Sequence, residues 1–320
     1  MTLSSVWVLV EPTNGTLTTT SLELLSAARS LASNVAAITW GDADVASLVG
    51  EYGASTLYRV GDLAGALPGA PVASAIAALV AAQGAPDAIL IPTSYDGRDV
   101  AGRLSAKLNR TVLTNVTGLT DHDGLESEHP LFGGTQMAFA HFTGEAPGIV
   151  VVRAKSFAAE ASGGAPATVV AAPVGELGAS ASARVVASHV EERSGPQLED
   201  AAVVVSGGRG LGSADKYALI EELAGLLKGA AGASRAIVDA GWVPYSRQVG
   251  QTGKTVKPTV YLACAISGAT QHMVGMKGSK NIVAVNKDPD APIFQIADLG
   301  IVGDVNSVLP ALIEALRQRA

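Results

Sequence analysis

The 320-residue chain has a single cysteine, Cys264, and aromatic residues make up only 4% of it. One cysteine excludes an internal disulfide framework and a zinc site built from cysteines, and it fits a reducing compartment. With so few aromatic rings, the core must be built from Ala, Val, Leu and Ile. Apolar residues make up 48% of the chain, which is typical of a globular protein and too many for a disordered one.

Long hydrophobic runs are also missing. The longest apolar tracts, such as AIAALVAA at 75–82, are far shorter than the roughly 20 residues that span a bilayer. The N-terminal residues lead into a strand-like run and show neither the charged segment nor the long apolar segment of a signal peptide. We therefore expect no direct membrane insertion and a cytoplasmic location.

Positive charge is in deficit, with 22 Lys and Arg against 29 Asp and Glu, which argues against a general nucleic-acid binder. The acidic excess lies before residue 197, because residues 197–320 hold 12 basic and 11 acidic side chains. Between 209 and 287 the balance is 10 basic to 4 acidic. This local excess suits a phosphate-bearing ligand, although a solvated surface with ordinary lysines explains the charge equally well.

Motifs for catalysis and for metal binding are absent as well. Five histidines are scattered over positions 122, 129, 141, 189 and 272, without the spacing of a zinc-binding helix. His122 lies between Asp121 and Asp123, and a solvated loop explains it better than a metal site. No nucleophile motif of the G-x-S-x-G type is present, and Cys264 lies in an apolar run where a thiol is usually inert. We predict no metal site and no catalytic residue.

The first half of the chain alternates between strand-like and helix-like segments. Strands are expected at 6–11, 35–41, 56–61 and 88–94, with helices at 21–32, 46–53, 71–83 and 99–109. Nearly unbroken apolar strands that follow helices are typical of a buried parallel sheet. Two further runs, PLFGGTQMAFAHF at 130–142 and GIVVVRAKSF at 148–157, are expected to form antiparallel or edge strands.

The second half restarts this alternation after a boundary near SGPQ, at 194–197. We expect strands at 201–208, 235–239, 259–267 and 281–288, helices at 213–229 and 268–278, and a last helix at 305–319 that Pro310 interrupts. The sequence thus predicts an α/β protein with two Rossmann-like domains and mostly parallel sheets, one at 1–195 and the other at 196–320.

A glycine-rich turn, VVVSGGRGLGS at 203–213, joins the first strand of the second half to its helix. Glycines let the backbone approach a ligand, and the helix start would point N–H groups at an anion. The turn is not the standard dinucleotide fingerprint, because Ser213 stands where its third glycine would be. A tight turn alone would explain the glycines, whereas Arg209 among them has little structural purpose and favours a ligand.

Three more segments carry polar residues where a ligand could bind. The segment at 235–256 contains an unusually long loop between one strand and the next. It includes QVGQTG, whose amides and hydroxyl suit the edge of a flat heterocycle, although a plain surface loop is as good an explanation. The turn AISGATQHMVGM, at 265–276, opens at the carboxyl end of a strand, where parallel sheets bind ligands. A lone histidine is usually structural, but His272 in this turn favours function. Asn286 ends the next strand, and Asp304 follows a further strand-like run.

Several of these runs together resemble one family. The run PTVYLACAISGATQHMVGMKGSKNIVAVNKDPDAPIFQIADLGIVGD, at 258–304, is similar to the C-terminal signature of the electron transfer flavoprotein alpha subunit. VVSGGRGLGS, GASRAIVDAGWVP and QVGQTGKTVKP match the same family in the same order. The resemblance is dense over about 200–304 and looser before it. It implies one FAD, held mainly by the C-terminal domain, and a heterodimer in which the N-terminal domain contacts a beta subunit.

The resemblance also implies a role for individual residues. Ser234 would lie near the pyrophosphate, Arg235 against the isoalloxazine ring, Thr252 near N5 with Gln251 beside it, and His272 near O2. The adenosine end would fall to Asn286, Asp304 and Val305. The full set of FAD contacts implied is Arg209, Ser234, Arg235, Gln248, Val249, Gly250, Gln251, Thr252, Gly253, Ser267, Gly268, Ala269, Thr270, Gln271, His272, Asn286, Asp304 and Val305.

The function that follows from the resemblance is electron transport by a carrier that turns over no substrate of its own. Such a carrier accepts electrons from flavoprotein dehydrogenases, for example the acyl-CoA dehydrogenases of fatty acid oxidation. It passes them one at a time to a membrane quinone oxidoreductase through an anionic semiquinone, which the permanent charge of Arg235 would stabilise. The alternatives are a subunit of an electron-bifurcating flavoprotein that oxidises NADH, a nicotinamide or flavin oxidoreductase, and a nucleotide-binding scaffold.

Overall fold

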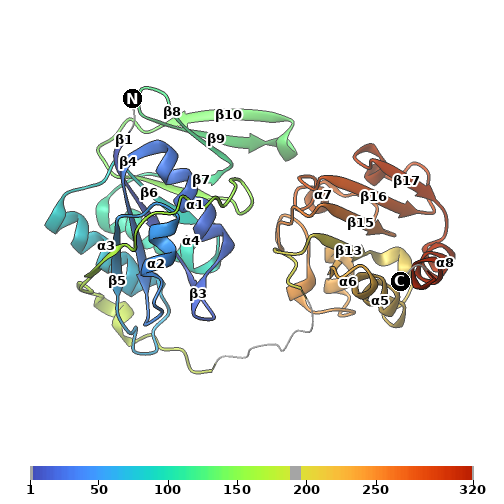
Figure 1. The fold of residues 1–320 in the computed structure, drawn as a ribbon. Coiled ribbons are helices and arrows are strands. Elements are labelled where there is room, and N and C mark those ends of the chain that lie inside the picture. The colour runs from blue at the N-terminus through green and yellow to red at the C-terminus, as the bar shows by residue number, and fades with distance from the viewer. Residues whose placement is uncertain (1–2, 188–195, 319–320) are drawn as a thin grey trace. The chain divides into compact units, whose positions relative to one another are not determined.

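The structure is a computed structural model that describes residues 3–187 and 196–318, and the chain divides into two compact units, Met1–His189 and Val190–Ala320 (Figure 1). The domain boundary expected from the sequence, at 195/196, borders residues 188–195 and so lies outside the described residues. The main sheet of each unit contains parallel pairs throughout, which confirms the predicted α/β class. Within the described ranges, no helix has the length and apolar character needed to cross a membrane.

Unit 1 is built on a seven-stranded parallel sheet with the strand order β12-β5-β4-β1-β6-β11-β7. Its strands are β1 (Leu3–Leu9), β4 (Ala32–Trp40), β5 (Thr56–Val60), β6 (Ala88–Pro92), β7 (Val112–Val116), β11 (Gly148–Val152) and β12 (Thr168–Ala171). Its helices are α1 (Thr19–Leu31), α2 (Ala46–Glu51), α3 (Gly69–Gln83) and α4 (Tyr95–Leu108). A two-residue hairpin, β2 (Pro12–Thr13) and β3 (Thr16–Leu17), precedes α1.

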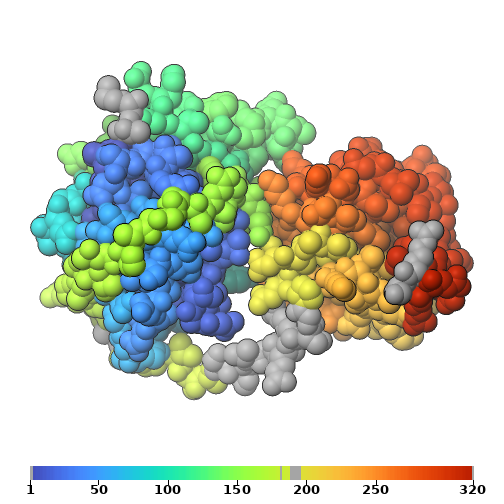
Figure 2. All heavy atoms as spheres, viewed as in Figure 1, coloured from blue at the N-terminus to red at the C-terminus, as the bar shows by residue number. Residues whose placement is uncertain are grey.

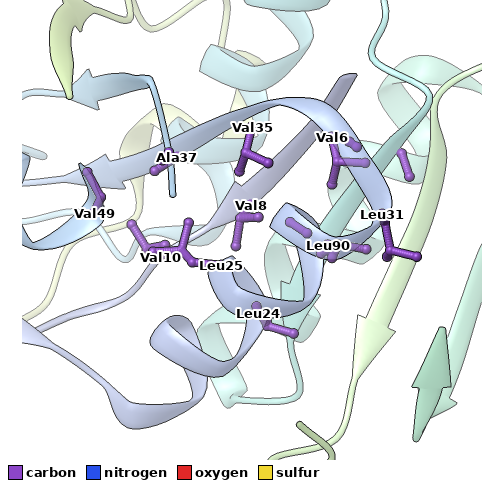
Figure 3. Close-up of a cluster of buried hydrophobic side chains, with 14 of the residues drawn as sticks. Val6, Val8, Val10, Leu24, Leu25, Leu31, Val35, Ala37, Val49 and Leu90 are labelled. Carbon is purple, nitrogen blue, oxygen red and sulfur yellow. The ribbon is translucent and has the colours of Figure 1, made fainter. Parts of the chain in front are cut away.

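Helices cover both faces of this sheet, because successive side chains of β1 point to opposite sides. Val8 packs on one side with Leu24 and Leu25 of α1 (Figure 3). Leu9 packs on the other side with Ile76 of α3. The buried cores on the two faces consist mainly of aliphatic side chains, as the shortage of aromatic residues predicted.

A second, three-stranded antiparallel sheet is inserted between β7 and β11. It consists of β8 (Gly118–Asp121), β9 (Leu125–Leu131) and β10 (Gln136–His141), in the order β10-β9-β8. The antiparallel expectation for 130–142 is therefore confirmed. The same expectation is wrong for 148–157, because β11 lies between β6 and β7 and pairs in parallel with both. All five of its residues are buried, which an edge strand would not allow.

The segment after β11 crosses the outside of unit 1 to reach the far edge of the sheet, where β12 pairs with β5 (Figure 2, yellow-green). Backbone hydrogen bonds hold it on the way, from the Ser162 N–H to the Glu51 carbonyl and from the Ala167 N–H to the Ala46 carbonyl. The edge strand β12 thus comes from a segment for which no strand was expected from the sequence.

Unit 2 has a five-stranded parallel sheet with the order β14-β13-β15-β16-β17. Its strands are β13 (Val203–Gly207), β14 (Ala230–Ala233), β15 (Val260–Cys264), β16 (Asn281–Asn286) and β17 (Leu299–Val302), and its helices are α5 (Ala218–Leu226), α6 (Arg235–Asp239), α7 (Thr270–Met273) and α8 (Val305–Arg317). Because β14 and β15 lie on opposite sides of β13, the chain reverses its direction of travel across the sheet at β13.

The prediction of a strand at 235–239 is wrong, because these residues form the short helix α6. The strand is the preceding segment, β14, which pairs in register with β13 from Ala230 to Ala233. Alanine and glycine have low strand propensity, so the sequence hides this strand. Small residues are needed there, since a Cβ on Gly232 would lie 2.3 Å from the Ser206 hydroxyl oxygen.

The other helices of unit 2 also differ from expectation. The crossover expected at 268–278 contains only the four-residue helix α7, and the helix expected at 213–229 is shortened to α5 with a turn before it. Helix α8 runs through Pro310 without interruption. These differences lie outside the sheet, so they leave the predicted order of the strands β13, β15 and β16 in the chain unchanged.

Candidate functional site

A cavity of about 570 Å³ lies in unit 2 where four parallel strands end. Its walls come from the segments that follow β13, β14, β15 and β16, together with the loop at 248–252. This is the point at which the strand order reverses, and open parallel sheets bind their ligands beyond the carboxyl ends of the strands at such a point. The topology alone therefore places a candidate binding site here.

Two of the wall segments pass each other at backbone distance. A Cβ on Gly208 would lie 2.2 Å from the Ala265 carbonyl oxygen, so only glycine fits at this crossing. The Gly208 N–H donates to the Cys264 carbonyl, at 2.9 Å. The close packing of these two segments therefore explains Gly208, in line with the tight turn that was one explanation of the glycines. Arg209 follows immediately, is exposed and lines the cavity.

The loop at 248–253 is fixed by backbone hydrogen bonds. The Val249 N–H donates to the Ala233 carbonyl at the end of β14, and the Gln251 N–H donates to the Gln271 carbonyl, at 2.7 Å. The Gln248 side chain is almost fully buried and donates to the Thr252 hydroxyl, at 3.0 Å. The loop therefore presents its amides and its hydroxyl to the cavity from a defined position, whereas a plain surface loop would lack these anchors.

In the segment of the cavity wall that follows β14, a basic side chain is paired with an acidic one. Arg235 and Asp239 are one turn apart on α6, and their Nε and Oδ2 atoms are 3.1 Å apart. Both side chains are more than half exposed and both line the cavity. The pair places a guanidinium at the cavity wall while partly compensating its charge.

His272 is the one histidine in the wall of this cavity, and it is 6% exposed. Its Nε2 lies 3.0 Å from the hydroxyl of Tyr261, which is fully buried on β15, and its Nδ1 is buried without a well-formed hydrogen bond. Burial lowers the pKa of His272 to about 4, and an interaction with the Val249 backbone offsets only part of this. The ring is therefore neutral at pH 7 and can donate one N–H and accept one hydrogen bond.

Most of the residues expected to bind a ligand come together in this cavity. Those that line it are Arg209, Ser234, Arg235, Gln248, Val249, Gly250, Gln251, Thr252, Ser267, Ala269, Gln271, His272 and Asn286. Five others do not line it: Gly253, Gly268, Thr270, Asp304 and Val305. Asp304 instead caps α8 by accepting from the Asn306 N–H, and Val305 is buried in the core.

The cavity also contains residues that the sequence did not single out. They are Gly210, Ala236, Asp239, Ala265, Ile266, Asp288, Ala291 and Pro292. Asp239 could have been found only by reading 235–239 as a helix, because helical spacing places it beside Arg235. Asp288, Ala291 and Pro292 lie in the proline-bounded turn after β16, and the carboxyl end of that strand was the available signal.

Comparison with known proteins identifies the family. A family model described as the electron transfer flavoprotein FAD-binding domain matches residues 197–277, and one described as the electron transfer flavoprotein domain matches residues 6–177. The first match contains most of the cavity wall. The two matches agree with the division of the chain into two α/β units.

Similar proteins share one name, and two of those named below match nearly the whole length of the chain. The chain is 42% identical over 324 residues to the electron transfer flavoprotein subunit alpha of Mycobacterium leprae, covering 99% of both proteins. It is 39% identical to the same subunit of Thermoanaerobacterium thermosaccharolyticum, over 98% of both, and 47% identical to that of Paracoccus denitrificans over 70% of this chain and 71% of the relative. The chain therefore belongs to the electron transfer flavoprotein alpha subunit family, which binds FAD.

Proposed function

We propose that the cavity of unit 2 holds the flavin of FAD and that the chain works as a one-electron carrier. The observation that carries this proposal is the cavity itself, which gathers Arg209, Arg235 and His272 around about 570 Å³ at the strand ends. This volume is within the range of roughly 300–1,000 Å³ that is usual for cofactor sites. A buried Nδ1 without a well-formed hydrogen bond, on His272, is the polar atom that a bound ligand would satisfy.

The side chains that line the cavity have distinct parts in this proposal. FAD supplies the redox chemistry, and the protein supplies position and electrostatics. Arg235 keeps its charge at any physiological pH and would favour negative charge on the ring system. His272 would offer a neutral hydrogen-bond donor, and the Thr252 hydroxyl a second polar contact at the ring edge. Arg209 and Ser234, at the strand ends, would hold the phosphates; Asn286 is proposed for the adenosine end.

The partners are proposed from the family. The relatives are named as alpha subunits, and we take the partner of this chain to be a beta subunit that contacts unit 1. Flavoprotein dehydrogenases, including those of fatty acid oxidation, would donate the electrons, and a membrane quinone oxidoreductase would accept them. In this scheme the chain has no substrate of its own. Asp304 and Val305 do not line the cavity, so they would contact the adenosine only where it extends outside the cavity.

The test is an absorption spectrum of the chain co-expressed with its beta subunit, followed by stepwise reduction with dithionite. We expect flavin bands, and then the red anionic semiquinone that the family resemblance implies. Arg235→Ala should lower the yield of that species, whereas Arg317→Ala, which removes an arginine paired with Glu222 outside the cavity, should leave it unchanged.

Three results would count against the proposal. Colourless protein that does not take up added FAD would contradict a flavin site. An unchanged semiquinone yield in Arg235→Ala would contradict the role of that side chain. Oxidation of NADH by the purified heterodimer, with a second FAD bound, would favour the electron-bifurcating alternative.

A further inference from the structure

The outer face of the three-stranded sheet in unit 1 brings together side chains that are distant in sequence. Glu126 on β9 is the cross-strand partner of His141 on β10, and their Oε2 and Nε2 atoms are 2.9 Å apart. The turn between β8 and β9 carries His122, whose N–H donates to the Gly124 carbonyl, at 2.9 Å. One ligand atom from each of these side chains lies within 4.8 Å of the other two.

We infer that His122, Glu126 and His141 form a binding site for Zn²⁺. Two imidazoles and one carboxylate are a donor set that zinc uses when it keeps a fourth position open for water or another ligand. With bonds of about 2.0–2.2 Å, tetrahedral ligand atoms are roughly 3.3 Å apart. The observed spread of up to 4.8 Å therefore requires side-chain movement of about 1 Å.

The surroundings allow this movement. His122 and His141 are exposed and Glu126 is partly exposed, so the side chains can turn toward a common centre without disturbing the core. The backbones are held in place, since β9 pairs with β8 on one side and with β10 on the other. The side chains can therefore move to bind an ion from solution, while the backbone that carries them stays fixed.

Charge and ligand chemistry also favour this ion. Asp121 and Asp123 flank His122, so the turn is acidic and attracts cations. Imidazole ligands select zinc and similar transition metals over Mg²⁺ and Ca²⁺, which prefer sites made of oxygen atoms. From the sequence alone a solvated loop explains His122 better, because nothing in the spacing shows that β10 brings His141 to the same place.

This inference does not rest on the flavin proposal, since the three residues belong to unit 1 and the flavin cavity belongs to unit 2. Binding would tie the β8–β9 turn to β10 across the intervening strand. The site would therefore add a cross-link to a small sheet that has only three strands, and leave one coordination position facing solvent.

The test is a calorimetric titration of ZnCl₂ into the full chain, purified without a histidine tag and stripped with a chelator. We expect one Zn²⁺ per chain, with affinity lost at acid pH because imidazole binds metals only in its neutral form. His122→Ala and His141→Ala should each weaken binding about tenfold or more, and Glu126→Gln should weaken it as well.

His129→Ala is the matched control, because His129 lies on β9, the strand that carries Glu126. Both of its ring nitrogens hydrogen-bond within the protein, to Ser127 and to the Thr114 carbonyl. It should leave the zinc affinity unchanged. The thermal midpoint of each variant without metal verifies that the sheet has folded. The assignment would be overturned by the absence of binding to the folded chain, by full affinity in both His122→Ala and His141→Ala, or by displacement of Zn²⁺ with millimolar Mg²⁺.

Discussion

At the scale of single residues, the ion pair on α6 affects how much positive charge a ligand in the cavity of unit 2 meets. Asp239 lies within 3.1 Å of the Arg235 guanidinium, and both side chains face solvent and the cavity. An exposed pair of this kind is worth about 0.2–1 kcal/mol. Asp239 therefore partly compensates the charge of Arg235, and with the flavin bound as proposed it would lower the redox potential of the flavin.

We predict that Asp239→Asn raises the first one-electron potential of the bound flavin. The expected shift is roughly 10–40 mV, since 59 mV for one electron corresponds to a tenfold change in an equilibrium constant. Spectroelectrochemical titration of the heterodimer measures it. Glu222→Gln, which opens an ion pair with Arg317 away from the cavity, is the control. A lowered potential in Asp239→Asn would show that Asp239 does not act through the charge of Arg235.

Glu11 is a buried carboxyl that the flavin site does not use. It follows β1, is 8% exposed, and accepts a hydrogen bond from the Ser94 hydroxyl at the start of α4. Burial raises its pKa from the ordinary 4.5 to about 7, and the charge of Asp96 adds to the effect. Folding therefore favours the protonated form, so the contribution of Glu11 to the free energy of unfolding is greatest below pH 4.5 and declines as the pH rises to about 7.

We predict that Glu11→Gln removes this decline. The gain relative to the original chain should grow between pH 5 and pH 7 and reach roughly 3 kcal/mol at most. Urea unfolding at pH 5, 6, 7 and 8 measures it. Glu51→Gln, at an exposed position on α2, should show no such pH dependence. A difference between Glu11→Gln and the original chain that stays constant over this range would mean that the carboxyl is ionised in both states.

At the scale of elements, the long apolar strands were predictable and the small-residue strand was not. β1, β6, β13, β15 and β16 carry runs of Val, Leu and Ile, and buried parallel strands need such runs. β14 consists of alanine and glycine, and its position is decided by the close approach of Ser206 to Gly232, which is a tertiary contact. Local propensity therefore favoured 235–239, and this error also concealed the pairing of Asp239 with Arg235.

The candidate site was predictable to the extent that it consists of strand ends. Ser267 and Asn286 lie at the carboxyl ends of strands expected from the sequence, and a parallel sheet brings such positions to one edge. Ser234 follows β14, which the sequence hides, so only the family resemblance indicated it. The zinc-binding cluster was not predictable in this way. Its geometry depends on the register of an antiparallel hairpin, His141 opposite Glu126, and one-residue slips in register would separate the two side chains.

The segment from α7 to β16 meets the loop at 248–253 through two glycines. A Cβ on Gly275 would lie 2.5 Å from the Gly250 backbone, so the loop can keep its position only if residue 275 has no side chain. A Cβ on Gly278, three residues later, would lie 3.6 Å from its nearest neighbour, which is a carbon of the flexible Lys257 side chain. The two positions form a matched pair within one segment.

We predict that Gly275→Ala displaces the loop and weakens FAD binding, whereas Gly278→Ala does not. Overpacking of this kind costs about 1–3 kcal/mol, and the loop carries Gln251 and Thr252 at the cavity wall. The FAD content after gel filtration and the thermal midpoint measure the two effects. Equal FAD retention in both variants would show that the loop tolerates displacement without loss of the cofactor.

At the scale of the whole molecule, each unit has its own buried cores on the two faces of its own sheet. Those of unit 2 include Val205 and Leu309 on one face and Tyr261 and Ile293 on the other. Among the described residues, all those that line the candidate site lie between Arg209 and Pro292, within the same unit. Folding and cofactor binding should therefore be properties of unit 2 alone.

We predict that a fragment of residues 196–320 folds and binds FAD. The unfolding of the fragment should be cooperative. In the full chain, the unfolding transition of unit 2 should not change with substitutions in unit 1 such as Glu11→Gln. Calorimetry and FAD titration measure this, with Gly275→Ala as the variant that should lose affinity in fragment and full chain alike. A folded fragment without affinity for FAD would mean that residues outside unit 2, from unit 1 or from the partner subunit, complete the site. An unfolded fragment would mean that its two cores are insufficient without unit 1.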